Sequence, residues 1–225
     1  MNALMSFYGL PDGLPRRMND EQLLFVVTLR RIKGTGFASV LSNFVWKLSY
    51  GHVVVYIVVW RCADDELPFV WKGEVNHVLP GDCVALHTTM GFDNITLDDL
   101  NDAIKLSETH WATWHRCVDP MQLAPLSLRS DLRMLAECYP NYSVLSNNCG
   151  HWVVRVLVTL LQHIDHNTTE KLISEKGISL SSLFAKFPGL KDILPILAMP
   201  IGDTFVAMPT YETCGSPPEK KRRVA

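Results

Sequence analysis

Runs of apolar residues predict the strands of this chain. Residues 23–32 and 51–60 are apolar stretches rich in β-branched side chains, and their lengths suit buried strands. Residues 69–78 resume the strand pattern after Pro68, which predicts a partner for residues 51–60 across a loop. Residues 83–87 predict a further short strand.

Helical spacing appears between and after these strands. Residues 37–48 carry apolar side chains at helical intervals and predict a short helix. Thr96, followed three residues later by Asp99, predicts the capped start of another helix. Residues 110–118 are aromatic and fit neither pattern, whereas Ser130 predicts the cap of a further short helix.

The strongest helical pattern covers residues 149–164. Four polar side chains fall on one stripe and apolar side chains on the other, so the pattern predicts a polar face opposite a buried one. The polar stripe consists of His151, Arg155, Thr159 and Gln162. Cys149 begins this helix on the buried side. Residues 168–174 and 180–187 predict two short helices, and residues 190–206 form an apolar segment interrupted by prolines.

Together the elements predict an α+β protein. A small antiparallel sheet, built around residues 23–32, 52–60 and 69–78, is expected to pack on the helix that begins at Cys149. The predicted organisation is a flexible leader over residues 1–20, a main domain over 21–166, a helical and apolar extension over 167–215, and a disordered basic tail over 216–225.

The composition is that of an ordinary globular protein. Of the 225 residues, 48% are hydrophobic and 20% are charged, and the net charge of -2 gives no reason to expect a nucleic-acid partner. The basic residues 220–223 fit either a nuclear import signal or a solvated tail. The most apolar windows, residues 53–60 and 153–161, are shorter than the roughly 18 residues that a transmembrane helix needs, so we expect no transmembrane segment.

Cysteine usage points to a reducing compartment. The six cysteines include no CxxC pair, and residues 1–17 lack the basic-then-apolar order of a secretory signal. Both features predict free thiols and a cytoplasmic or nuclear location. Isolated pairs such as Cys83 with His87 lack a second pair at zinc-ligand spacing, so we expect no metal site and no cofactor.

Cys149 differs from the other cysteines because it begins a predicted helix directly after the turn residues Asn147 and Asn148. The unpaired N–H groups and the dipole of a helix N-terminus favour an anion and lower the pKa of a thiol. The same groups could stabilise the oxyanion of a tetrahedral intermediate, and Gly150 lets a substrate carbonyl approach the backbone. The alternative interpretation is that Cys149 is a small apolar core residue.

A nucleophilic thiol needs a base, and His52 is the best-placed histidine because it begins a buried strand, where its side chain can reach a cleft. A third group would orient the imidazole. If the turn is centred on residues 64–65, His77 lies opposite His52 on the same face. A shift of one residue would bring Asn76 or Val78 there instead.

Two motifs resemble the catalytic boxes of permuted papain-fold enzymes. The sequence YSVLSNNCGHW at residues 142–152 resembles the nucleophile box of the PPPDE peptidases, which include desumoylating isopeptidases. It is also similar to the Asn-Cys-Glu-His-Phe box of the lecithin:retinol acyltransferase-like families. The sequence HVVVY at residues 52–56 resembles their upstream histidine motif, in the same order along the chain. Gly150 and Trp152 depart from the pattern, because these families have Asn or Glu, and Phe, at those places.

The resemblance implies a permuted papain-like fold in which Cys149 is the nucleophile and His52 the general base. His77 is the nearest fit to a second histidine. The residues that the resemblance places around the oxyanion and the substrate are Asn148, Gly150 and Trp152.

Three functions stay open on this basis. A thiol-dependent hydrolase would cleave an amide or isopeptide bond through a thioester acyl-enzyme, for example in a ubiquitin-like protein conjugate. A lipid acyltransferase or phospholipase would act on a lipid ester, and the apolar residues 190–206 would suit a peripheral membrane contact. A papain-fold protein could instead bind a partner and catalyse nothing.

Overall fold

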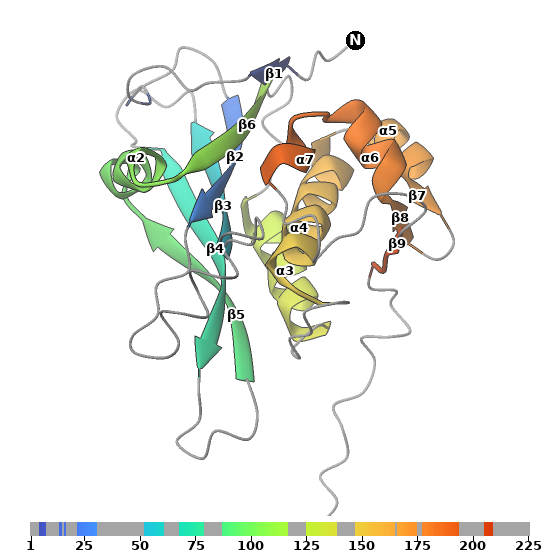
Figure 1. The fold of residues 1–225 in the computed structure, drawn as a ribbon, viewed down its shortest axis with the longest axis horizontal. Coiled ribbons are helices and arrows are strands. Elements are labelled where there is room, and N and C mark those ends of the chain that lie inside the picture. The colour runs from blue at the N-terminus through green and yellow to red at the C-terminus, as the bar shows by residue number, and fades with distance from the viewer. Residues whose placement is uncertain are drawn as a thin grey trace, which may run out of the picture.

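A central antiparallel sheet carries helices on both faces (Figure 1). Helix α2 (Leu97–Lys105) lies on one face, and helices α3 (Pro125–Cys138) and α4 (Cys149–Ile164) lie on the other. This arrangement confirms the α+β class and the packing of the helix that begins at Cys149 on an antiparallel sheet. The computed structural model describes residues 5–7, 14, 16, 22–30, 52–60, 68–78, 87–116, 125–138, 147–164, 166–174, 177–193 and 205–208.

Within the described residues the large sheet has six strands in the order β1-β6-β2-β3-β4-β5, and every neighbouring pair is antiparallel. The strands are β1 (Met5–Phe7), β2 (Gln22–Arg30), β3 (His52–Trp60), β4 (Phe69–Val78), β5 (His87–Ile95) and β6 (Thr109–Arg116). Strands β2 and β3 are buried along most of their length because helices cover both faces of the sheet, which explains their continuous apolar sequences. Three predicted strands are thereby confirmed.

Strands β5 and β6 extend the sheet beyond the prediction. The aromatic pattern of residues 110–118 fits neither helix nor strand, yet residues 109–116 form β6 because they pair with β2 along most of their length. Strand β5 begins at His87, where the predicted short strand ended, and pairs with β4. Pairing between distant segments decides both strands, and a local sequence pattern does not contain that information.

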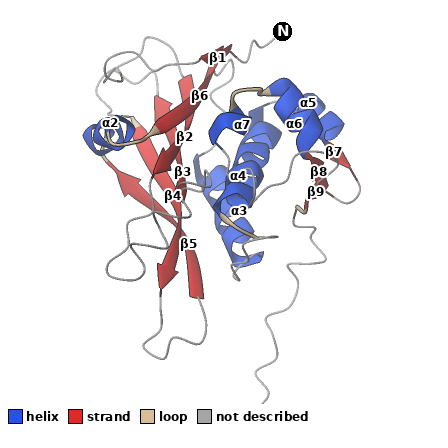
Figure 2. Cartoon of the chain, viewed as in Figure 1, coloured by secondary structure: helices blue, strands red, loops and turns tan. Residues whose placement is uncertain are grey.

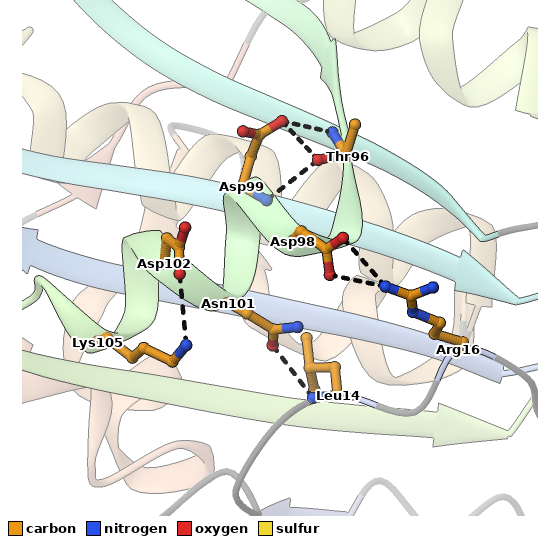
Figure 3. Close-up of polar contacts among 8 residues, drawn as sticks. All are labelled: Leu14, Arg16, Thr96, Asp98, Asp99, Asn101, Asp102 and Lys105. Atoms are coloured by element: carbon orange, nitrogen blue, oxygen red, sulfur yellow. Dashed lines mark hydrogen bonds and ion pairs between the residues drawn. The ribbon is translucent and has the colours of Figure 1, made fainter.

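Helix α2 begins as predicted, with a capping box at its N-terminus (Figure 3). The Asp99 backbone N–H donates to the Thr96 hydroxyl oxygen at 3.1 Å, and the Thr96 backbone N–H donates to the Asp99 carboxylate at 3.0 Å. Leu97, Leu100 and Ala103 are buried, so they form the face of α2 that packs on the sheet.

Part of the predicted flexible leader contacts this side of the molecule. Strand β1 pairs with β6, and the Leu14 backbone N–H donates to the Asn101 side-chain oxygen at 3.1 Å (Figure 3). Leu14 is buried, and Arg16 forms an exposed ion pair with Asp98 at 3.2 Å. At residues 5–7, 14 and 16 the chain is thus attached to the fold.

The two faces of the sheet belong to two separate apolar clusters. Odd-numbered residues of β3, such as Val55 and Ile57, pack with α3 and α4 in what we call the α4-face cluster. Even-numbered residues, such as Val54 and Tyr56, pack with α2 in the α2-face cluster. This division follows from the alternation of side chains along a strand.

Helix α4 is buried on all sides, which corrects the predicted division into a polar and an apolar face. His151, Arg155 and Thr159 of the expected polar stripe are buried, and only Gln162 of that stripe is exposed. The C-terminal elements cover this side of α4, so the stripe faces protein and not solvent (Figure 2). Helix α3 also differs from prediction, because it begins at Pro125 and not at Ser130.

Most of the C-terminal elements form a small layer beyond α4, whereas α7 (Leu190–Ile193) packs against β6 and β2 of the large sheet (Figures 1 and 2). The other C-terminal elements are α5 (His166–Leu172), β7 (Ile173–Ser174), β8 (Gly177–Ser179), α6 (Leu180–Lys186) and β9 (Phe205–Val206), and the three strands pair in the order β7-β8-β9. Helices α5 and α6 confirm the two predicted short helices. The α4-face cluster includes residues of this layer, so one core crosses the predicted boundary between residues 166 and 167.

Cys138, at the end of α3, is disulfide-bonded, which differs from the expectation that the cysteines are free thiols. Cys149 is not part of a disulfide. No helix among the described residues is long and apolar enough to cross a bilayer. The predicted helix at residues 37–48 and the basic tail at residues 216–225 lie outside the described residues.

Candidate functional site

Cys149 is the first residue of α4, as the sequence predicted, and its side chain belongs to the α4-face cluster. It is 7% exposed, so a small reagent can reach it only through a narrow opening or a local movement. Helix α4 packs against β3 and β4 of the sheet and against β9 of the C-terminal layer. The thiol therefore lies at a helix N-terminus between two layers of the protein.

Asn148 caps α4 from the position directly before the thiol. Its side-chain oxygen accepts a hydrogen bond from the His151 backbone N–H at 3.1 Å, and its backbone carbonyl accepts the first helical bond, from the Trp152 N–H at 3.0 Å. Asn148 is 1% exposed. The predicted turn residue is thus a buried helix cap.

The Asn148 side chain also determines the tautomer of His151. Its oxygen lies 2.9 Å from His151 Nδ1, and it is already the acceptor of the His151 backbone N–H. Two acceptors cannot bond to each other, so Nδ1 carries the imidazole proton and Nε2 carries the lone pair. The Asn148 backbone nitrogen is 3.5 Å from Nδ1, too long to compete.

Burial keeps this imidazole neutral. The pKa of His151 is lowered to about 4, first by desolvation and then by the positive charge of Arg155 one helical turn away. His151 is therefore uncharged at neutral pH, in keeping with its Nδ1–H contact to Asn148. The sequence pattern predicts instead that His151 lies on a solvent-exposed face of the helix.

Asn147 and Arg155 form a second contact at the start of α4. Arg155 Nη1 donates to the Asn147 side-chain oxygen at 2.6 Å, and Arg155 Nε donates to the carbonyl of Ala207 at 2.9 Å. Arg155 is 2% exposed and Asn147 is buried as well. The two residues before Cys149 thus each contact a side chain of α4: Asn147 contacts Arg155, and Asn148 contacts His151.

Strand alternation separates His52 from Cys149. Residue 52 has the same parity as Val54 and Tyr56, which pack in the α2-face cluster, whereas Cys149 belongs to the α4-face cluster. Its cross-strand partner Arg30 donates to the Tyr56 hydroxyl at 2.8 Å, as expected for side chains on that same face. By alternation, residue 52 is directed toward the opposite face of the sheet from Cys149, and the dyad stays a prediction.

The register of β3 and β4 does not place His77 opposite His52. Val55 pairs with Gly73, which is one residue away from the register in which the two histidines face each other. Along β4 and β5 the backbone of His77 instead pairs with that of Thr88. When the observed register is continued to the start of β3, Asn76 lies opposite His52, which is one of the two alternatives that the sequence left open.

Gly150 and Trp152 occupy different surroundings. Trp152 is completely buried in the α4-face cluster. Gly150 lies in the first turn of α4, where a backbone N–H has no acceptor within the helix itself. Its N–H is a candidate donor to an oxyanion.

Sequence reasoning missed the contacts of Asn147, His151 and Arg155. The signal for them was present as polar residues at helical spacing, but only the C-terminal layer turns that stripe into an interior one. Among the described residues, no group of three or more His, Cys, Asp or Glu side chains could hold a metal ion.

No protein-family model, curated protein or solved structure matches this chain. The resemblance at residues 142–152 and 52–56 is therefore limited to two short motifs.

Proposed function

We propose that this chain is a thiol-dependent hydrolase of permuted papain-like type that acts on amide or isopeptide bonds, with Cys149 as the nucleophile. One observation carries the proposal: the thiol of Cys149 heads a 16-residue helix directly after a buried asparagine cap. The N–H groups of a helix N-terminus also stabilise an oxyanion that forms beside the thiol. The motif around Cys149 adds the resemblance to the PPPDE box.

In the proposed reaction the Cys149 thiolate attacks the substrate carbonyl carbon. The oxyanion that forms would accept a hydrogen bond from the Gly150 N–H. Collapse of the tetrahedral intermediate breaks the C–N bond, the amine leaves with a proton, and a thioester remains on Cys149. Water then releases the carboxylate and restores the thiol.

His52 takes the role of general base in this proposal, on the resemblance of residues 52–56. It would remove the thiol proton and later protonate the leaving amine. Because alternation directs residue 52 toward the α2 face, the dyad would form only after the first residue of β3 turns toward α4.

The second candidate is a papain-fold protein that binds a partner without catalysis. The alternation of β3, which directs residue 52 toward the α2 face, favours it, because a general base must come within hydrogen-bond reach of the thiol.

Cleavage of a ubiquitin-like conjugate, assayed beside hydrolysis of a phospholipid ester, decides between these candidates. We expect Cys149→Ala to abolish conjugate cleavage and His52→Ala to lower it by about 100-fold or more, which is the usual contribution of a general base. His110→Ala is the matched control, because His110 is also a half-buried strand histidine, and it should stay within about threefold of the unmodified chain.

Four results would contradict the hydrolase. Cleavage that survives Cys149→Ala removes the nucleophile, and equal loss in the two histidine variants removes the base. Absence of turnover with both substrates favours the binding protein, whereas turnover of the lipid ester alone favours the acyltransferase.

A further inference from the structure

Arg155 joins the turn before Cys149 to the C-terminal segment of the chain. Its guanidinium donates to the Asn147 side-chain oxygen through Nη1 and to the Ala207 carbonyl through Nε, at 2.6 and 2.9 Å. Asn147 lies two residues before the thiol, whereas Ala207 follows β9 at the far end of the described chain. One buried side chain thus connects Asn147, which lies 8 residues before it in the sequence, to Ala207, which lies 52 residues after it.

The chemistry of this link makes it rigid. A guanidinium is planar and holds its donors in a fixed geometry, so bonds from Nη1 and Nε fix the two acceptors relative to each other. Burying that charge at 2% exposure is costly, and an apolar side chain would often stabilise the core as well. Its role is therefore better explained by geometry than by stability.

The C-terminal end of the link is also held by contacts outside α4. Strand β9 pairs with β8, with Val206 opposite Ile178, and Val206 is completely buried. Gly177 has φ of +140°, and a Cβ at that position would overlap the carbonyl oxygen of Val206. Only glycine allows this close approach, so Gly177 sets the position of the segment that presents Ala207.

We propose that Arg155 is a positioning residue, through which residues 205–208 control access to the Cys149 thiol. In the structure Arg155 holds Asn147, and the Cys149 thiol two residues later is 7% exposed. Release of the segment frees the turn and opens the thiol. The inference rests on the proposed function only for the choice of Cys149 as the reacting group.

Iodoacetamide alkylation of Cys149 in the full chain, followed by peptide mass spectrometry across a pH series, tests the coupling without any substrate. Arg155→Met removes the donors but keeps an apolar stem, Asn147→Ala removes one acceptor, and Gly177→Ala displaces the C-terminal segment without changing a residue of α4. We expect each to raise the alkylation rate by about tenfold or more, because access then needs a smaller local opening.

Leu100→Ala is the matched control for stability. Leu100 is fully buried in the α2-face cluster, so its truncation destabilises the fold without touching the link. We expect the alkylation rate of this variant to stay within about twofold of the unmodified chain under native conditions. The double variant Arg155→Met/Gly177→Ala should react no faster than either single variant, because both break the same link.

The coupling is overturned if the three link variants alkylate Cys149 no faster than Leu100→Ala at the same melting temperature. The coupling would also be overturned if the increases in alkylation rate of the two single variants combine in the double variant. Arg155 and Gly177 would then affect access to the thiol through two independent movements. If Arg155→Met does not fold, Asn147→Ala and Gly177→Ala decide alone. A chain without hydrolase activity can still show the coupling, so the two proposals fail separately.

Discussion

At the scale of single residues, His151 makes stability depend on pH. Its pKa in the folded chain is lowered to about 4 by burial and by Arg155, against 6.5 for an ordinary histidine. Between these values the unfolded chain binds more protons than the folded chain, so the free energy of unfolding falls as pH falls. We expect His151 to contribute at most about 3 kcal/mol to this loss, with full stability above pH 6.5.

Urea denaturation at a series of pH values measures this effect. His151→Asn is the matched variant, because its amide nitrogen can take the place of Nδ1–H beside Asn148 but cannot titrate. The variant should lose less stability than the unmodified chain between pH 6.5 and pH 4. Identical pH profiles would show that His151 is not held neutral by the fold.

At the scale of elements, helix α2 depends on its capping box. Thr96→Ala removes the acceptor of the Asp99 N–H and should lower the free energy of unfolding by about 1 kcal/mol. The pKa of Asp99 is lowered by its hydrogen bonds to the Thr96 side chain and backbone, so it should rise toward its ordinary value in the variant. Urea denaturation and NMR titration measure the two effects.

Thr96→Ser is the control for this variant, because the serine hydroxyl can still accept from the Asp99 N–H. It should retain most of the stability and the low pKa of Asp99. If Thr96→Ser and Thr96→Ala have the same free energy of unfolding and the same pKa of Asp99, the capping box does not stabilise α2.

The same elements show how far the sequence predicts this fold. The start of α2 and the extent of α4 are local properties, since a cap and an apolar repeat determine each, and both were predicted correctly. Strand β6 could not be predicted because its aromatic residues become a strand only beside β2. The β3–β4 register could not be predicted because it depends on the geometry of the loop between the two strands.

The candidate site also combines features that the local sequence predicts with features that depend on distant residues. The position of Cys149 at a helix N-terminus follows from residues next to it in the sequence, so the pattern located it. Arg155 bonds to Asn147 and to Ala207, which lies far along the chain, and no local pattern indicates either contact. Sequence reasoning therefore finds the thiol but not the side chains that hold the turn before it.

At the scale of the whole molecule, one core joins the sheet to the C-terminal layer. Trp111 of β6 contacts Phe187, which follows α6, edge to face with ring centroids 5.6 Å apart. Helix α7 also packs against β6 and β2. Because these contacts belong to the α4-face cluster, we expect residues 177–193 to unfold together with the sheet and not as a separate extension.

Phe187→Leu tests this cooperativity. Loss of the edge contact and of part of the buried ring should cost about 1–3 kcal/mol, and hydrogen exchange should show the same loss for amides of β2 and of α6. Leu100→Ala, on the opposite face of the sheet, should likewise lower protection in α6, because a single unit transmits a loss of stability from either face. Protection that falls in α6 but stays unchanged in β2 after Phe187→Leu would mean that the C-terminal layer opens alone, and the boundary predicted between residues 166 and 167 would then be a real one.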